Sequence, residues 1–118
     1  MTDFVYLPHC KLLEQSDTTV SLCLNIPENL YYFQGHFTEI PLLPGVVQLD
    51  WVMHYLKQYF SINPTKLASV DALKFKRIIR PDTETILTLN KLSSTKYTFE
   101  FSVNNSSDSS GKAVFHDS

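Results

Sequence analysis

The stretch PGVVQLDWVMHYLKQYF, residues 44–60, decides the fold, because it is the segment of the chain with a helical period. Its apolar residues recur at i, i+3, i+7, i+10 and i+14, a spacing that places them along one face of an α-helix. These residues are Val46, Leu49, Met53, Leu56 and Phe60. Trp51, Val52 and Tyr55 lie off that face, so the helix is apolar on most sides and is predicted to be wrapped by other structure.

Both ends of this helix carry local signals. Pro44 suits a position in the first turn, and Gly45 allows the backbone there to come close to another group. After the helix, Asn63 and Pro64 mark its end.

Strands are predicted on both sides of the helix. Residues 20–26 and 97–103 alternate between apolar and polar side chains, which indicates strands with one buried face. Residues 85–89, TILTL, are β-branched and apolar and predict a third strand. Residues 67–75 and 112–115 are weaker strand predictions. Residues 104–111, NNSSDSSG, are interpreted as a hairpin loop.

The order of elements is therefore strand, loop, buried helix and four strands, which predicts an α+β fold. A sheet that covers a single long helix has to curl around it. This is the hot-dog arrangement, a curled antiparallel sheet wrapped around one central helix, although the pattern leaves other α+β rolls open. With 118 residues, the chain is expected to form a single domain, residues 1–118.

Composition excludes several classes of protein. The net charge of −2 argues against nucleic acid as the main partner, since phosphate binding needs a basic surplus. Cys10 and Cys23 are too few for a disulfide scaffold, and Cys23 is expected to be a buried thiol. No signal peptide, membrane-spanning helix or metal site is expected, and the cytoplasm is the expected compartment.

A histidine and an aspartate stand out in residues 33–52, FQGHFTEIPLLPGVVQLDWV. His36 lies in a loop between Gly35 and Phe37, and histidine is suited to proton transfer near neutral pH. Asp50 lies fourteen positions later, at the edge of the apolar helix face. Such an aspartate either reaches solvent or is a desolvated acid with a raised pKa that can donate a proton.

The start of the helix supplies a third feature. Free N–H groups at a helix N-terminus can stabilise an oxyanion, and Gly45 has no side chain to block a ligand carbonyl. A loop base, an oxyanion donor and a helix acid within fifteen residues describe proton abstraction next to a carbonyl, with departure of a β-hydroxyl.

The stretch FQGHFTEIPLLPGVVQLD resembles the motif GHFPxxPxxPGVxxxE/D of the β-hydroxyacyl-ACP dehydratases. The distance from His36 to Asp50 agrees without a gap, while Thr38 and Glu39 depart from the family pattern. Residues 75–89, FKRIIRPDTETILTL, resemble a later run of the same family. The small size and the string LPGVVQLDW are most similar to the short dehydratases of aryl-polyene-type pigment clusters.

The resemblance implies that His36 removes the α-proton of an acyl thioester and that Asp50 protonates the departing β-hydroxyl. The backbone N–H of Gly45 would hold the carbonyl oxygen. In this family the base and the acid come from different subunits, so a dimer is implied, either of identical chains or with a related dehydratase-like subunit. No metal and no bound cofactor are implied, because the substrate is carried on phosphopantetheine.

Further residues are assigned to substrate and partner binding. The acyl chain is expected to lie along the helix, against a set of apolar residues formed by Phe33, Phe37, Val46, Val47 and Trp51. A basic cluster is expected to attract the acidic acyl carrier protein, unless it is only the solvated face of a strand. It consists of Lys74, Lys76, Arg77 and Arg80.

Two other functions stay open from the sequence. A hot-dog thioesterase would release a free acid and a thiol, and a non-catalytic partner subunit would lend only its shape to a heterodimer. The spacing from His36 to Asp50 and the PGV turn favour the dehydratase over the thioesterase, and the presence of both residues argues against the non-catalytic subunit. Acyl chain length, carrier protein against coenzyme A, and isomerase activity also stay open.

Overall fold

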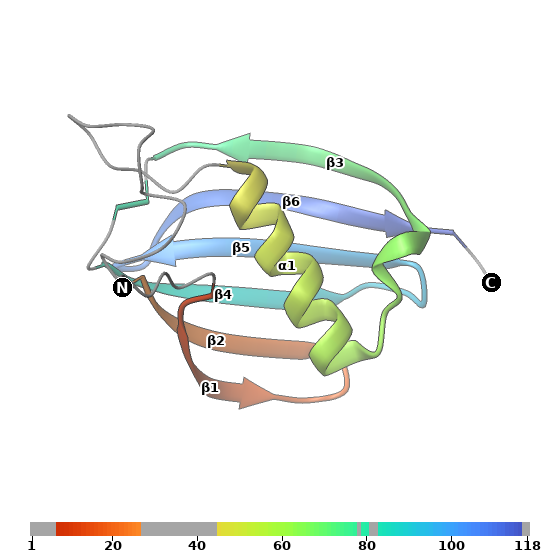
Figure 1. Cartoon of the computed structure of the whole chain (residues 1–118), viewed down its shortest axis with the longest axis horizontal. Coiled ribbons are helices and arrows are strands. Elements are labelled where there is room, and N and C mark those ends of the chain that lie inside the picture. The colour runs from red at the N-terminus through yellow and green to blue at the C-terminus, as the bar shows by residue number, and fades with distance from the viewer. Residues whose placement is uncertain (1–6, 27–44, 78, 81–82, 117–118) are drawn as a thin grey trace, which may run out of the picture.

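A six-stranded antiparallel sheet curls around one long helix in the computed structural model, which describes residues 7–26, 45–77, 79–80 and 83–116. The elements in chain order are β1 (His9–Gln15), β2 (Thr19–Ile26), α1 (Gly45–Phe60), the short 3-10 helix η2 (Pro64–Lys66), β3 (Leu67–Phe75), β4 (Thr83–Lys91), β5 (Lys96–Val103) and β6 (Ser106–Phe115). The strand order is β1-β2-β4-β5-β6-β3, and α1 crosses one face of the sheet (Figure 1). The predicted hot-dog fold is confirmed.

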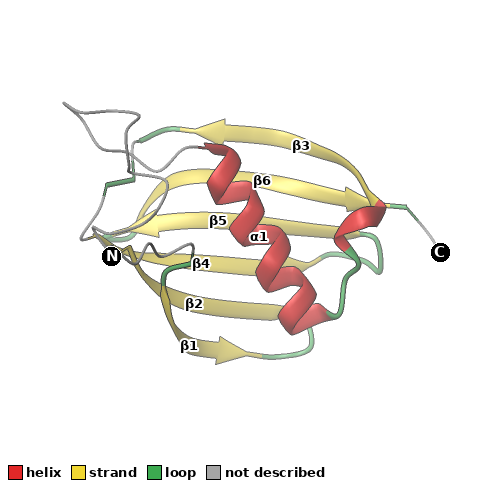
Figure 2. Cartoon of the chain, viewed as in Figure 1, coloured by secondary structure: helices red, strands yellow, loops and turns green. Residues whose placement is uncertain are grey.

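The core lies between α1 and the middle strands of the sheet. Alternate residues of β2, β4 and β5 point at the helix and are almost fully buried, Leu22, Leu87 and Phe101 among them. From the helix side, Trp51 and Leu56 fill the same space. Figure 2 shows the helix as the single layer over this face of the sheet. Within the described ranges, no helix has the length and apolar character that a membrane crossing requires.

Most of the predicted elements are confirmed, with α1 at Gly45–Phe60 and strands at all five predicted places. Strand β1 was not predicted, because its sequence HCKLLEQ has no alternation. Every residue of β1 is exposed, so burial imposes no pattern on it. Cys23 is buried, as predicted, and Cys10 is exposed.

The prediction of a hairpin loop at residues 104–111 is wrong. Only Asn104 and Asn105 form the turn, both with positive φ (51° and 65°), and Val103 pairs with Ser106 on either side of it. Asparagine tolerates this left-handed backbone, which is the geometry of a tight two-residue hairpin. The remaining residues belong to β6, where Asp108 and Ser109 are buried.

Candidate active site

The candidate site is built at the start of α1, where the helix meets the end of β3. Gly45 is the first helical residue. A Cβ atom on Gly45 would lie 2.7 Å from Cζ of Phe75, the last residue of β3, so the phenyl ring covers the glycine. A larger residue at position 45 would therefore displace the ring of Phe75. The role of the Gly45 N–H stays a prediction.

Asp50 lies on the second turn of α1 and is exposed in the single chain. The described residues of one chain do not provide the desolvation predicted for its carboxyl group. The predicted residues His36, Phe33 and Phe37 lie outside the described residues.

The other predicted substrate residues on α1 are in the core. Val47 and Trp51 are almost fully buried among the apolar side chains of the sheet, and the side chain of Val46 is outside the described part. Three cavities lined by described residues lie elsewhere, one along the sheet and two near the C-terminal end of α1, and neither Val47 nor Trp51 lines any of them. Their contact with an acyl chain stays a prediction.

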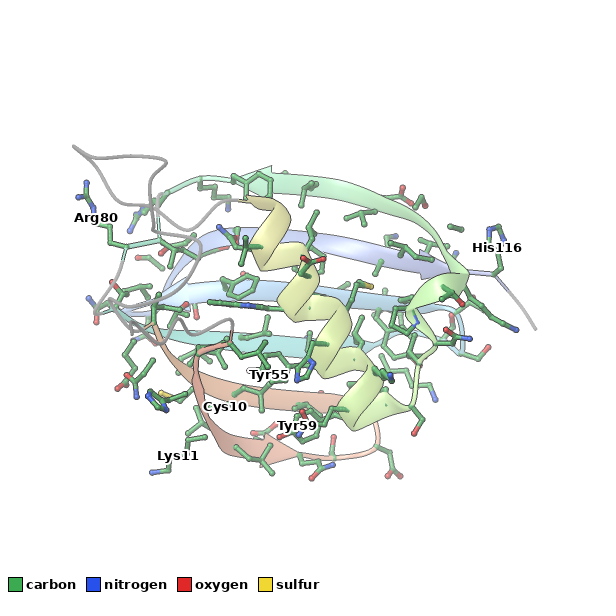
Figure 3. All side chains as sticks on the ribbon, in the orientation of Figure 1. Cys10, Lys11, Tyr55, Tyr59, Arg80 and His116 are labelled. Atoms are coloured by element: carbon green, nitrogen blue, oxygen red, sulfur yellow. The ribbon has the colours of Figure 1, made fainter. Side chains whose placement is uncertain are left out.

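All four residues of the predicted basic cluster are exposed. Lys74 lies in β3, and the backbone N–H groups of Lys76 and Arg77 both donate to the carbonyl oxygen of Asp108, at 2.7 and 3.1 Å. Arg80 lies at the same end of the molecule as the start of α1, and His116 lies at the opposite end (Figure 3). Because Phe75 separates Lys74 from Lys76 and contacts Gly45, this cluster borders the candidate site.

Sequence reasoning missed a buried polar link beneath the site. The hydroxyl of Ser109 donates a hydrogen bond of 2.7 Å to Oε1 of Gln48, which lies in the first turn of α1. A signal was present, because Gly111, Ala113 and Phe115 are alternate buried residues of β6, and the same alternation extended backwards reaches Ser109. The polar composition of NNSSDSSG concealed it.

Asp108 is a second residue that the sequence did not single out. It is only 3% exposed, and its Oδ1 atom is buried without a hydrogen-bond partner. Burial raises the pKa of the Asp108 carboxyl group, and the positive charge of Arg77 opposes that increase.

The side of α1 away from its start carries a different polar contact. Tyr55 and Cys10, from α1 and β1, are hydrogen-bonded neighbours (Figure 3). Burial raises the pKa of Tyr55 far above its ordinary value, and the Cys10 thiol adds to this effect. Tyr55 is therefore a neutral hydroxyl at any physiological pH, and it ties the edge strand β1 to the helix. In the described ranges, no cluster of three histidine, cysteine or acidic residues could hold a metal ion.

Comparison with known proteins identifies the family. The family model described as ApeI dehydratase matches residues 12–112. The 3-hydroxyacyl-[acyl-carrier-protein] dehydratase FabZ of Streptococcus pneumoniae serotype 4 is 32% identical over 88 residues, which are 66% of this chain and 60% of that protein. The chain therefore spans less than two thirds of that relative.

Two further proteins are similar over more of their length. FabZ of Syntrophobacter fumaroxidans is 30% identical over 111 residues, which are 82% of this chain and 76% of that protein. A chain in the structure of the dehydratase heterocomplex ApeI:P from Xenorhabdus doucetiae superposes with a TM-score of 0.82 at 28% identity, covering 93% of this chain and 98% of that one. Because the family model covers residues 12–112, most of its length, this chain belongs to the ApeI-like dehydratase family.

Proposed function

We propose that this chain is a 3-hydroxyacyl-[acyl-carrier-protein] dehydratase, a hydro-lyase that converts a 3-hydroxyacyl thioester to a trans-2-enoyl thioester in fatty-acid or polyene-type biosynthesis. The observation that carries the proposal is the family match over residues 12–112, within which His36, Gly45 and Asp50 keep the motif spacing. The names of the FabZ relatives and of the ApeI:P complex support the same reaction class.

Each residue has a defined role in the proposed mechanism. His36 acts as general base and takes the proton from the carbon next to the thioester carbonyl. Gly45, as the first residue of α1, has a backbone N–H with no partner inside the helix, and this N–H stabilises the developing negative charge on the carbonyl oxygen. Asp50 acts as general acid and gives its proton to the departing β-hydroxyl group, so that water leaves as the double bond forms.

The exposure of Asp50 in one chain supports a site that two chains complete. A general acid needs a protected environment to hold its proton at neutral pH, and the described part of a single chain leaves Asp50 open. In the described sheet, β3 pairs with β6 on one side only, and Leu73 and Phe75 of β3 are large exposed apolar residues. An unpaired strand edge of this kind is suited to pairing with a second chain. The proposed working unit is a dimer, with an identical or a related dehydratase-like subunit.

The proposed carrier-docking surface is the basic cluster Lys74, Lys76, Arg77 and Arg80. Its place beside Gly45 suits a substrate that arrives on the phosphopantetheine arm of an acidic carrier protein. No resident cofactor is proposed. Reversing the charge of Arg77 and Arg80 together is expected to raise KM for the carrier-bound substrate and to leave kcat on a small free thioester unchanged. Equal KM values in the variant and the parent would contradict this docking surface.

The function is tested with purified protein and a 3-hydroxyacyl thioester, with enoyl product measured by mass spectrometry. His36→Ala and Asp50→Asn are each expected to lower kcat by about 100-fold or more, the usual contribution of a general acid or base. Asp17→Asn, which removes an exposed carboxylate in the β1–β2 turn, is the matched control and is expected to keep full activity. Release of free acid and thiol instead of enoyl thioester would indicate a thioesterase and overturn the proposal.

The shared site has its own test. Mixed dimers of the His36→Ala and Asp50→Asn chains are expected to recover activity that neither variant has alone, because one of their two sites then holds both intact residues. Mixtures as inactive as the separate variants would show that base and acid belong to the same chain.

A further inference from the structure

The link between β6 and α1 begins with an irregularity in the sheet. Along the β5–β6 pairing, Phe101 lies opposite Ser109 and Ser102 lies opposite Ser107, so Asp108 is an extra residue with no partner in register. Such a β-bulge re-aims the side chains around it. As a result, Asp108 and Ser109 are both buried although they are consecutive, which regular alternation would not allow.

The bulge holds the first turn of α1 through one buried hydrogen bond. Ser109 is fully buried and Gln48 is 4% exposed, and the hydroxyl of Ser109 donates to Oε1 of Gln48 at 2.7 Å. Because Oε1 accepts this bond, the orientation of the Gln48 amide is fixed, with its NH₂ group directed the other way. A short hydrogen bond in this low-dielectric setting is stronger than the same bond at the surface.

Gln48 lies between the two residues of α1 that the proposed mechanism uses. It follows Gly45 by three positions and precedes Asp50 by two. A bond that holds Gln48 therefore fixes how the start of α1 is rotated about the helix axis and how far it lies from the sheet. That part of the helix carries the Gly45 N–H and the Asp50 carboxyl group. On the other side of the bulge, the Asp108 carbonyl oxygen accepts the N–H groups of Lys76 and Arg77. One bulge thus holds both the helix start and part of the basic cluster.

We infer that Ser109 is a positioning residue for dehydration, acting through Gln48 to place Gly45 and Asp50 of α1. The inference rests on the proposed function. A displacement of reacting groups by about 1 Å can lower a rate by up to about 100-fold. Loss of the Ser109 hydroxyl is therefore expected to reduce kcat, while KM, which reflects substrate contacts made elsewhere, stays close to its normal value.

The test uses Ser109→Ala, with Thr85→Val as the matched control. Thr85 is also fully buried, and its hydroxyl donates to the carbonyl oxygen of Ser102 at 3.0 Å, a bond between the neighbouring strands β4 and β5. Ser109→Ala is expected to lower kcat by about tenfold or more with KM nearly unchanged. Thr85→Val is expected to lower the melting temperature to a similar degree and to keep kcat. Equal kcat values for the two variants would overturn the inference.

A double-mutant cycle separates a direct link from two independent effects. Gln48→Met keeps the length of the side chain and removes the acceptor. The double variant Ser109→Ala/Gln48→Met is expected to have the same kcat as Gln48→Met alone, because the bond can be lost only once. Losses that multiply would show that the two residues act independently and would contradict the inference.

Two further measurements keep the outcome clear. If Ser109→Ala does not fold, Ser109→Cys retains the size of the side chain and a weak donor, and a kcat equal to that of the parent would count against the role of the hydroxyl. The parent and His36→Ala are assayed alongside. A parent that is inactive both alone and with a related dehydratase-like subunit refutes the proposed function, whereas an active parent with an equally active Ser109→Ala refutes only the positioning role.

Discussion

Two glycines are each covered by the ring of a phenylalanine, one in the buried centre of the sheet and one at its exposed edge. A Cβ atom on Gly111 of β6 would lie 2.6 Å from Cζ of Phe99, and one on Gly45 of α1 would lie 2.7 Å from Cζ of Phe75. The two distances are alike, but the rings are not. Phe99 is 3% exposed in the middle of the core, whereas Phe75 is 49% exposed at the end of β3.

The difference in exposure of the two rings indicates a different role for each glycine. In the centre, the ring of Phe99 is packed among buried core side chains, so a larger residue at 111 is expected to strain the core. At the edge, the ring of Phe75 can turn toward solvent, so a larger residue at 45 leaves the core intact. The requirement for glycine at 111 concerns stability, and the requirement at 45 concerns access to the helix start.

The largest effect is expected at the centre. Gly111→Ala should lower the free energy of unfolding by about 2 kcal/mol, the usual cost of overpacking a filled core. Urea denaturation measures the change, and Ser110→Ala on the neighbouring residue is the control, with an expected change below about 0.5 kcal/mol. The second change Phe99→Leu should recover part of the loss. A Gly111→Ala protein as stable as the parent would remove the contrast between the two glycines.

A smaller effect, on activity, is expected at the edge. Gly45→Ala should change stability by less than about 1 kcal/mol, because the better helix propensity of alanine offsets the displacement of the ring. Its kcat/KM should fall about tenfold, less than the loss of an oxyanion donor, since the N–H remains while the methyl group and the displaced ring crowd it. Adding Phe75→Leu should restore activity if the ring is the cause. An unchanged kcat/KM in Gly45→Ala would show that this end of the helix is not near the reaction.

The smallest effect is expected beside the bulge, at Asp108. Its folded pKa is raised above the ordinary 3.8, so folding favours the neutral carboxyl group. The neutral carboxyl group therefore stabilises the folded protein fully below pH 3.8. This contribution is lost as the pH rises through the pKa that Asp108 has in the folded protein. Asp108→Asn should therefore raise the free energy of unfolding by about 1 kcal/mol at neutral pH, and the gain should shrink in acid.

Urea denaturation at several pH values measures the effect of Asp108→Asn. Asp71→Asn, which changes an exposed carboxylate on β3, is the control and should show no such trend. If Asp108→Asn raises the free energy of unfolding equally at every pH, then the packing of the asparagine side chain, and not the loss of the charge, is responsible.

The sequence predicted the elements that have a periodic pattern. The helix and the alternating strands β2 and β5 are long enough, and buried enough on one face, for their period to decide the structure. Strand β1 is exposed along its whole length, so its pairing with β2 does not require an alternation of apolar and polar residues in its sequence. The start of β6 was mistaken for a loop because its buried residues are serines and an aspartate.

The site was predictable only in part, for a similar physical reason. A motif with fixed spacing along the chain makes His36, Gly45 and Asp50 the candidate residues, and Gly45 is the first residue of α1, as the sequence predicts. The partner of Gln48 lies 61 residues further along the chain, and contacts at that distance follow from the sheet register. Asp50 is exposed on the described chain, so the protected environment proposed for its carboxyl group is not encoded by a local pattern of this sequence.

The two cysteines lie on opposite faces of the sheet, since Cys10 pairs with the inward-facing Leu24 while Cys23 pairs with Lys11 and alternates with Leu22 and Leu24. They cannot form a disulfide with each other without a rearrangement of β1 and β2. Of the two thiols, only Cys10 is exposed, and β1 lies at the edge of the sheet farthest from β3. The natural chain thus offers one attachment point for a fluorescent dye, so that energy transfer between two labelled copies could follow their association in real time without any engineered residue.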